Sequence, residues 1–207
     1  MLVIIDYKTG NLGSIQNILK SIGIDSIISN DIKVIKKASK LILPGVGAFD
    51  TGIKSLKKLK LIEPLNYLAK EKCIPILGIC LGAQLMTKSS EEGSEEGLAW
   101  FNAKTIKFNF DKNSQKNVLP NIGWRDVFST SDIGLKFLEG INDTPRFYFV
   151  HSYHFQTEDS DLVAIKSNYA YEFPCCLSKN NLHCVQFHPE KSHRFGKYFL
   201  KNFVNSN

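Results

Sequence analysis

Residues 74–86 read Ile-Pro-Ile-Leu-Gly-Ile-Cys-Leu-Gly-Ala-Gln-Leu-Met, an apolar run followed by a cysteine between two glycines and then by a helical pattern. A turn of the form Gly-x-nucleophile-x-Gly between a strand and a helix forces a sharp, strained backbone. Glycine is expected at 78 and 82 because a Cβ there would strike the neighbouring strand or helix. Cys80 would then stand at a helix N-terminus, which favours its thiolate. The alternative is a small buried cysteine between two packing glycines.

A candidate base lies in the second half of the chain. Residues 186–190 read Gln-Phe-His-Pro-Glu and follow the strand-like run 182–185. A cysteine nucleophile needs a base to take its proton, and the base needs a carboxylate to orient it. His188 and Glu190 are two positions apart, so in an extended segment their side chains share one face. The alternative is a surface histidine near a strand end, which is the interpretation we favour for His183 and His193.

Taken together, these residues resemble the class I (triad) glutamine amidotransferases, with Cys80, His188 and Glu190 at the family's triad positions. Within that family the chain is most similar to the glutaminase subunit of imidazole glycerol phosphate synthase. The matching segments occur in the family's order and span nearly the whole chain. They are residues 5–7, 10–12, 43–49, 78–85, 90–92, 123–124, 147–153 and 186–192.

The glycine-rich segment 43–47, Leu-Pro-Gly-Val-Gly, ends a predicted parallel strand. Ligands bind beyond the carboxyl ends of such strands, and consecutive glycines expose backbone N–H groups that can form an oxyanion hole. The N–H of Leu81, the residue after the nucleophile, is the natural second donor. An ordinary strand-ending turn is the alternative. The resemblance places the family's oxyanion strand here, at Gly45, Val46 and Gly47.

Three further places are candidates for binding glutamine. Gln84 lies one helical turn after Cys80, although spacing alone equally allows a residue that faces solvent. Glu92 can pair with an α-ammonium group, or it can be a plain exposed acid. Residues 151–153 follow a predicted strand and could line the pocket edge. The resemblance places glutamine contacts at all three segments, and we assign them to Gln84, Glu92, Ser152 and Tyr153.

The arrangement of predicted elements favours an α/β fold with a doubly wound, mostly parallel central sheet flanked by helices. Buried strand-like runs alternate with helical patterns over the first ~90 residues. Beyond residue 98 short strands with turns predict a smaller antiparallel region, including a hairpin at 179–181, where Asn tolerates positive φ. Phe195, Phe199 and Phe203 recur at helical spacing and predict a packed C-terminal helix. The polar segment 111–117 is expected to be the most mobile loop. We expect a single glutamine amidotransferase domain over residues 1–207.

Composition narrows the class of protein. The chain has a net charge of +6, but its lysines are dispersed and no RNA-binding motif is present, so we expect no nucleic-acid partner. No run of about 18 apolar residues and no basic leader occurs, which predicts a cytoplasmic protein without membrane contact. The five cysteines show no Cys-x-x-Cys spacing, so we expect neither disulfides nor a metal site. No cofactor is expected.

The resemblance implies a reaction and a partner. A Cys80 thioester would release ammonia from glutamine, and a (β/α)₈-barrel cyclase in a heterodimer would use it to make imidazole glycerol phosphate and aminoimidazole carboxamide ribotide, in histidine biosynthesis. Trp124 and Lys191 are the expected docking residues. Nothing in the chain is suited to bind an ammonia acceptor, which favours such a partner.

Three departures from the family pattern leave a second interpretation open. Lys8 stands where glycine is common, residues 121–125 read Asn-Ile-Gly-Trp-Arg, and the tail 192–196 is similar to that of certain paralogues. Those paralogues supply ammonia to a synthetase that amidates a nucleotide sugar for surface polysaccharide. A non-catalytic flavodoxin-like binding module is a remote alternative, because it leaves Cys80 and the His188–Glu190 pair as accidents.

Overall fold

A computed structural model describes residues 1–110 and 118–206, so the predicted loop 111–117 lies outside the described residues. The chain forms a nine-stranded sheet in the order β2-β1-β3-β4-β11-β10-β9-β6-β7 and a separate two-stranded sheet, β5-β8. The strands are β1 (Leu2–Ile5), β2 (Ser26–Ser29), β3 (Lys40–Leu43), β4 (Ile76–Ile79), β5 (Lys104–Lys107), β6 (Asn121–Ser129), β7 (Arg146–His151), β8 (Tyr153–Gln156), β9 (Val163–Tyr169), β10 (Tyr171–Lys179) and β11 (Leu182–Val185).

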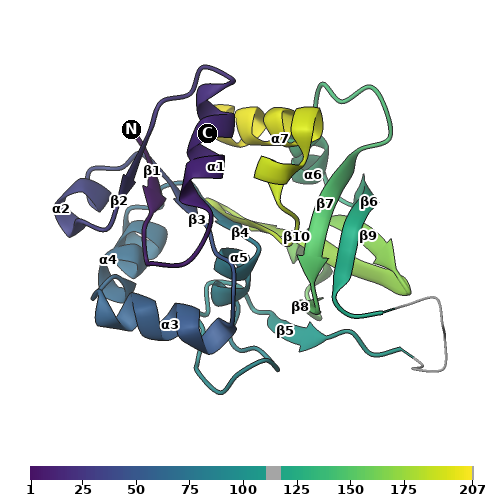
Figure 1. Ribbon diagram of the computed structural model, residues 1–207, viewed down its shortest axis with the longest axis horizontal. Coiled ribbons are helices and arrows are strands. Elements are labelled where there is room, and N and C mark those ends of the chain that lie inside the picture. Colours follow the sequence, from purple (N-terminus) through teal and green to yellow (C-terminus); the bar gives the residue numbers. More distant parts are fainter. Residues whose placement is uncertain (111–117, 207) are drawn as a thin grey trace.

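Helices connect the strands and cover the sheet (Figure 1). They are α1 (Leu12–Lys20), α2 (Ile32–Ile35), α3 (Phe49–Lys58), α4 (Ile62–Asn66), the π-helical turn η1 (Tyr67–Glu71), α5 (Leu81–Leu85), α6 (Asp132–Phe137), the 3₁₀ turns η2 (Ser160–Leu162) and η3 (Pro189–Lys191), and α7 (His193–Asn205). No helix in the described part of the chain is long and apolar enough to cross a membrane.

The parallel half of the sheet is buried on both faces, which explains its uninterrupted apolar runs. In β1, Val3 belongs to the core formed with α3, α4 and α5, whereas Ile4 belongs to the core formed with α1 and α7. These two groups of helices lie on opposite sides of the parallel strands (Figure 1). The expected doubly wound arrangement is therefore confirmed, and it places the carboxyl ends of β3, β4 and β11 side by side.

The antiparallel region continues the same sheet. Strand β11 pairs in parallel with β4 on one side and antiparallel with β10 on the other, so it joins the two halves. The predicted hairpin between β10 and β11 is present, and Asn180 has a φ of +53°. The predicted C-terminal helix is α7, and its three phenylalanines are buried. Helices α2 and α6 and strand β8 were not predicted.

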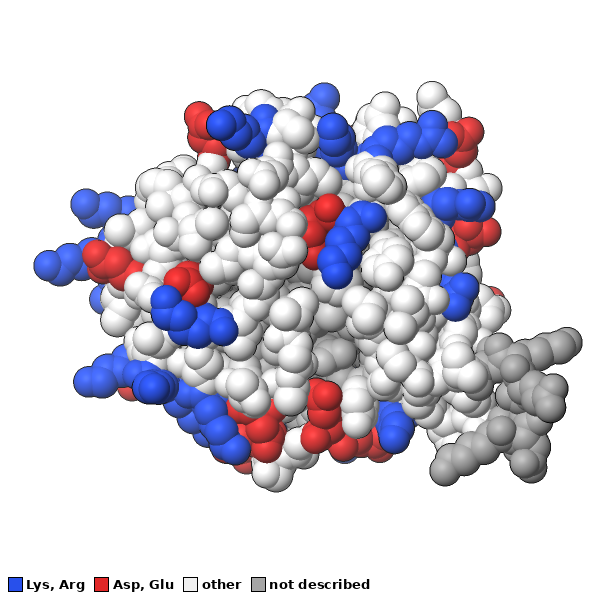
Figure 2. All heavy atoms as spheres, viewed as in Figure 1, with Lys and Arg blue, Asp and Glu red and all other residues white. Residues whose placement is uncertain are grey.

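The basic residues do not gather into one patch on the face shown in Figure 2, where lysines and arginines are dispersed with acidic residues between them. Several of the lysines form ion pairs, among them Lys54 with Asp50 and Lys8 with Asp6. On this face the charge is thus distributed in the way the sequence indicated, and no continuous basic groove is visible there.

Candidate active site

The nucleophile turn has the strained backbone that its glycines predicted. Cys80 stands between β4 and α5, at the N-cap of the helix, with φ +53° and ψ −111°. This is an unfavourable region for a residue with a Cβ, so the surrounding packing must hold it. Its N–H donates to the carbonyl of Val185 at the end of β11, at 2.8 Å. The side chain is 8% exposed and opens into a cavity.

Glycine is required on both sides of this turn by close approach of neighbouring groups. A Cβ at Gly82 would collide with the carbonyl oxygen of Leu43 in β3, and one at Gly78 would collide with Met86 and the backbone of Ala83. The helix therefore starts almost in contact with the adjacent strand, which no larger residue permits. The predicted reason for the two glycines is confirmed.

The candidate base and its carboxylate meet just beyond β11. His188 Nδ1 lies 2.7 Å from Glu190 Oε1, and both side chains are almost completely buried. The intervening segment is not extended as expected, because β11 ends at Val185 and residues 189–191 form the turn η3. The pair meets through this turn rather than by sharing one face of a strand. A hydrogen bond from Ser192 Oγ to the His188 carbonyl, at 2.6 Å, holds the turn closed.

The charge state of His188 follows from its neighbours. Burial alone would lower the pKa of His188, but its interactions with Cys80 and with Glu190 outweigh burial and raise that pKa to about 10. Nδ1 is occupied by Glu190, and Nε2 has no nitrogen or oxygen partner among the described residues. Nε2 is therefore the ring nitrogen available to Cys80, and the arrangement suits an imidazolium beside a thiolate.

The predicted oxyanion groups lie together, but one is already engaged. The N–H of Leu81 donates to the carbonyl of Gly45 at 3.3 Å. Val46 and Gly47 line the cavity with Leu81, and Gly47 has a φ of +109°. The structure thus places segment 45–47 beside the nucleophile, with a carbonyl rather than an N–H turned toward the Leu81 donor.

A cavity of about 270 Å³ joins these groups, a size that suits a small ligand. It brings together nine predicted residues; Gly45 adjoins Val46 in the chain, and Glu190 is hydrogen-bonded to His188. Its lining consists of Val46, Gly47, Cys80, Leu81, Gln84, Glu92, Pro120, Val150, His151, Ser152, Tyr153 and His188. Pro120 and Val150 were not selected from the sequence, whereas His151 belongs to the predicted pocket edge 151–153 but was not assigned a glutamine contact. Burial lowers the pKa of His151 to about 3, so His151 stays neutral at physiological pH.

The candidate substrate residues differ in their surroundings. Gln84 is 5% exposed, so the solvent-facing alternative for this residue is wrong. Glu92 is exposed, as its alternative supposed, but it also makes a specific contact: its Oε2 accepts the N–H of Phe49 at 2.8 Å and so caps α3. The N-cap residue of that helix, Ala48, supplies no side-chain cap. Glu92 therefore links the cavity to the helix that follows the oxyanion segment.

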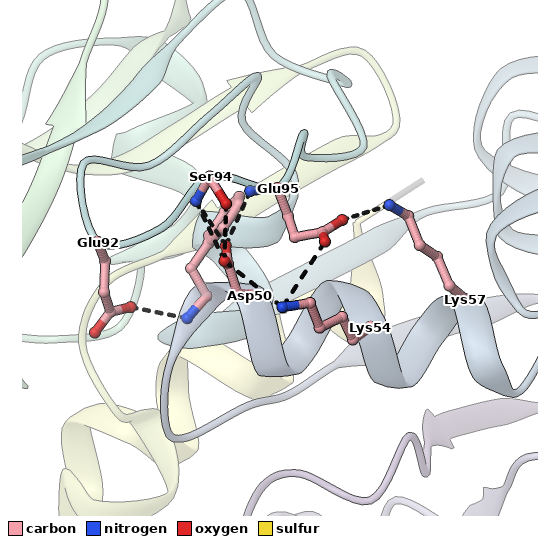
Figure 3. Close-up of polar contacts among 7 residues, drawn as sticks. Asp50, Lys54, Lys57, Glu92, Ser94 and Glu95 are labelled. Atoms are coloured by element: carbon pink, nitrogen blue, oxygen red, sulfur yellow. Dashed lines mark hydrogen bonds and ion pairs between the residues drawn. The ribbon is translucent and has the colours of Figure 1, made fainter.

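The loop that carries Glu92 is held against α3 by further contacts (Figure 3). The Asp50 carboxylate accepts the N–H groups of Ser94 and Glu95, each at 3.0 Å. Lys57 forms an ion pair with Glu95, and Lys54 lies near the same carboxylate. Asp50 was not selected from the sequence, although an acid in the first turn of a helix is a recognisable signal.

The predicted docking residues lie outside the cavity and close to each other. Trp124 is 37% exposed and stacks on His193, with ring planes 5° apart. Lys191 lies over the ring of Tyr148, which also contacts Trp124. His193 is exposed as expected, but His183 is not, because it is 4% exposed and packs against Phe137 and Phe203. The surface assignment of His183 is wrong.

Gln186 is a buried residue of this site that sequence reasoning missed. Its side-chain Nε2 lies 3.7 Å from Cys80 Sγ, and its Oε1 accepts from Gln84 Nε2 at 3.1 Å. The available signal was its position two residues before His188, because side chains two positions apart in an extended segment point to the same side. Among the described residues no group of His, Cys, Asp and Glu side chains could hold a metal ion.

Comparisons with known proteins agree with this site. The family model described as glutamine amidotransferase class-I matches residues 3–206. Two chains from Methanococcus maripaludis are similar over almost their whole lengths: imidazole glycerol phosphate synthase subunit HisH 2, at 49% identity over 205 residues (99% of this chain, 98% of that one), and HisH 1, at 42% over 208 residues (99% and 98%). A crystal structure of a glutamine amidotransferase superposes with a TM-score of 0.72 at 18% identity, covering 98% of each chain.

Proposed function

Because this chain belongs to the class I glutamine amidotransferase family, we propose that it hydrolyses glutamine at Cys80 and passes the ammonia to a cyclase partner. The observation that carries the proposal is the strained turn that holds Cys80 in one cavity with His188, itself paired with buried Glu190. The same constellation would be hard to maintain in a binding module that performs no chemistry.

The residues can divide the chemistry as follows. The Cys80 thiolate attacks the carboxamide carbon of glutamine, and the carbonyl oxygen becomes an oxyanion. The His188 imidazolium gives its proton to the departing nitrogen, so ammonia leaves and a thioester remains. Neutral His188 then takes a proton from water, whose oxygen attacks the thioester. Glutamate is released, and Cys80 returns as a thiolate beside protonated His188.

Glutamine would be oriented by the far wall of the cavity. Glu92 uses Oε2 to cap α3, which leaves Oε1 to accept from the substrate's α-ammonium group. Ser152, between β7 and β8, and Tyr153, the first residue of β8, also line the cavity. The α-carboxylate can be met there by backbone N–H groups, and Gln84 is placed nearer the reacting amide because it shares a helix turn with Cys80.

The proposed partner is a (β/α)₈-barrel cyclase bound as a heterodimer. Support comes from the names of the relatives, which are subunits of imidazole glycerol phosphate synthase. An exposed aromatic surface lies next to the triad, with Trp124, Tyr148 and Lys191 in contact and Ile122 half exposed beside them on β6. Such aromatic anchors are typical of docking sites. The products would be imidazole glycerol phosphate and aminoimidazole carboxamide ribotide.

A second partner is favoured by one specific feature. Asn121 and Arg125, which depart from the family pattern, form a hydrogen-bonded chain with His151: Arg125 Nε donates to Asn121 Oδ1 at 3.0 Å, and Asn121 Nδ2 lies 3.0 Å from His151 Nε2. The two changes thus fit each other. Methanococcus maripaludis also has two such chains of unequal similarity to this one. The alternative partner is a synthetase that amidates a nucleotide sugar.

The test is to mix the purified chain with each partner and its acceptor substrate, and to measure glutamate release together with the aminated product. Formation of imidazole glycerol phosphate with the cyclase alone among the partners would support the proposal. Product formation only with the sugar synthetase would keep the glutaminase and replace the pathway. A folded chain that hydrolyses no glutamine with either partner would contradict both proposals.

A further inference from the structure

Three buried side chains around the nucleophile form a closed ring of hydrogen bonds. Gln186 Nε2 donates to Cys80 Sγ at 3.7 Å, and Gln84 Nε2 donates to Gln186 Oε1 at 3.1 Å. The ring closes through the backbone, where the N–H of Gln84 donates to the carbonyl of Cys80 at 3.1 Å. Gln186 is completely buried, and its backbone N–H donates to the carbonyl of Cys175 at 2.9 Å.

The chemistry of a thiolate sets the direction of this ring. A thiolate only accepts hydrogen bonds, so Gln186 must turn its NH₂ group toward Sγ. Its Oε1 then faces Gln84 and needs a donor, which only the NH₂ group of Gln84 can supply. Gln84 also lines the cavity, so the hydrogen-bonded ring connects the sulfur to the cavity wall.

We propose that Gln186 is a further catalytic residue, which stabilises the Cys80 thiolate through its side-chain N–H, and that Gln84 is the positioning residue that keeps that N–H on the sulfur. The inference rests on the proposed role of Cys80 as the nucleophile. A hydrogen bond to an ionised acceptor is stronger than one to a neutral acceptor.

A second donor is useful because His188 cannot serve the sulfur throughout the reaction. His188 must give its proton to ammonia, and later it must take one from water. An amide N–H does not ionise, so Gln186 can hold the sulfur without protonating it. It would also stabilise the thiolate when the thioester is hydrolysed and Cys80 becomes the leaving group.

The test measures the reactivity of Cys80 toward iodoacetamide as a function of pH, in the full chain. The exposed Cys73 is replaced by serine in every protein, and Cys80→Ala identifies the signal. In Gln186→Leu we expect the midpoint of the alkylation profile to move up by about one pH unit and the rate at neutral pH to fall about tenfold. Gln84→Leu should shift the midpoint of the alkylation profile in the same direction by a smaller amount. Gln156→Leu, the same change at an exposed position of β8, should leave the profile unchanged.

Folding is checked by near-ultraviolet circular dichroism and thermal unfolding. A folded Gln186→Leu protein with an unaltered profile would overturn the proposal. If Gln186→Leu does not fold, Gln84→Leu decides in its place: a shifted midpoint supports the proposal and an unshifted one overturns it. With a partner present, Gln186→Leu should lower kcat more than it raises KM. A wild-type chain with reactive Cys80 but without glutamate release would contradict the proposed function and leave the role of Gln186 testable by alkylation.

Discussion

The N–H of Leu81 and the carbonyl of Gly45 form a hydrogen bond of 3.3 Å across the mouth of the nucleophile turn. This N–H is the donor expected to hold the oxyanion, so in this conformation the glycine-rich segment competes with the transition state for it. Rotation of the Gly45–Gly47 backbone would free the donor and bring a second N–H inward. Gly47 permits such a rotation, since it already has a φ of +109°.

We therefore predict that the isolated chain is a weak glutaminase that its partner activates. Loss of one oxyanion donor costs about 10²–10³ in rate, so activation of this order is expected. Glutamate release is measured for the chain alone, with its partner, and with partner plus acceptor ligand. Gly47→Ala should reduce the ratio of the activated rate to the basal rate, because an added Cβ strains the φ of +109° that this conformation requires. Equal rates in all three mixtures would contradict the gating model.

Cys80→Ala should abolish glutamine hydrolysis and leave the fold intact. The substitution replaces a thiol by a methyl group in a turn that accommodates a Cβ, although with strain. Cys175, Cys176 and Cys184 are buried in the core, and burial raises the pKa of each thiol. Their alanine variants, and that of exposed Cys73, should keep activity. An alkylating glutamine analogue should label Cys80 alone by peptide mapping, and labelling of Cys184 in its place would show that the nucleophile is misassigned.

His188→Asn should be nearly inactive, and Glu190→Gln should lose less activity. His188 transfers the proton, whereas Glu190 orients the ring and stabilises its charged form through the 2.7 Å hydrogen bond to Nδ1. The kcat of both variants is compared under activation by the partner. A larger loss in Glu190→Gln would reverse the division of roles. Lys197→Gln, at an exposed position of α7 outside the cavity, is the control for an unspecific effect of substitution near η3.

The nucleophile turn could be predicted from sequence because its glycines and cysteine stand within five residues, in the pattern of a sharp turn from strand to helix. The structure shows the expected neighbours: the start of α5 lies against Gly78, and strand β3 lies against Gly82. The start of α3 at Phe49 could not be predicted in this way. Its first turn is capped by Glu92, which comes from a loop 43 positions away. A contact between distant segments leaves no periodic signal.

The same reason explains the missed parts of the site. Gln186 touches Cys80 only because β11 lies beside β4, and strand order is not visible in the spacing of residues. His183 was assigned to the surface because histidine is polar, but β11 is buried on both faces and a hydrogen bond of 2.8 Å to Ser178 satisfies its Nδ1. Strand β8 follows β7 after a single residue, so its start at Tyr153 falls within the segment 151–153 that we predicted to line the pocket edge after a strand.

Acid should destabilise the protein through buried histidines. Burial, with a smaller effect of Lys40, lowers the pKa of His183 to about 4, whereas an unfolded histidine titrates near 6.5. The unfolded chain therefore binds the proton first, so stability is lost as pH falls from about 6.5 to about 4, by roughly 3 kcal/mol for this group. The free energy of unfolding, measured with urea, should fall by about 2–3 kcal/mol less in His183→Gln than in the wild type between pH 7 and pH 4.5. In His193→Gln, a change at the surface, the free energy of unfolding should depend on pH as it does in the wild type. The same pH dependence in all three proteins would rule out His183 as an acid-sensitive group.

Substitution of Glu92 should separate its two roles. In Glu92→Gln an amide oxygen can still accept the Phe49 N–H, but the charge that would pair with the substrate's α-ammonium group is lost. We expect KM for glutamine to rise about 10–100-fold, as for loss of a hydrogen-bonded charge, while thermal stability changes little. Glu92→Ala removes the cap as well and should also lower the free energy of unfolding by about 1 kcal/mol. The control is Glu96→Gln, a neighbouring exposed acid outside the cavity. If Glu92→Gln and the control both keep the wild-type KM for glutamine, Glu92 serves only to cap α3. Another group must then bind the ammonium.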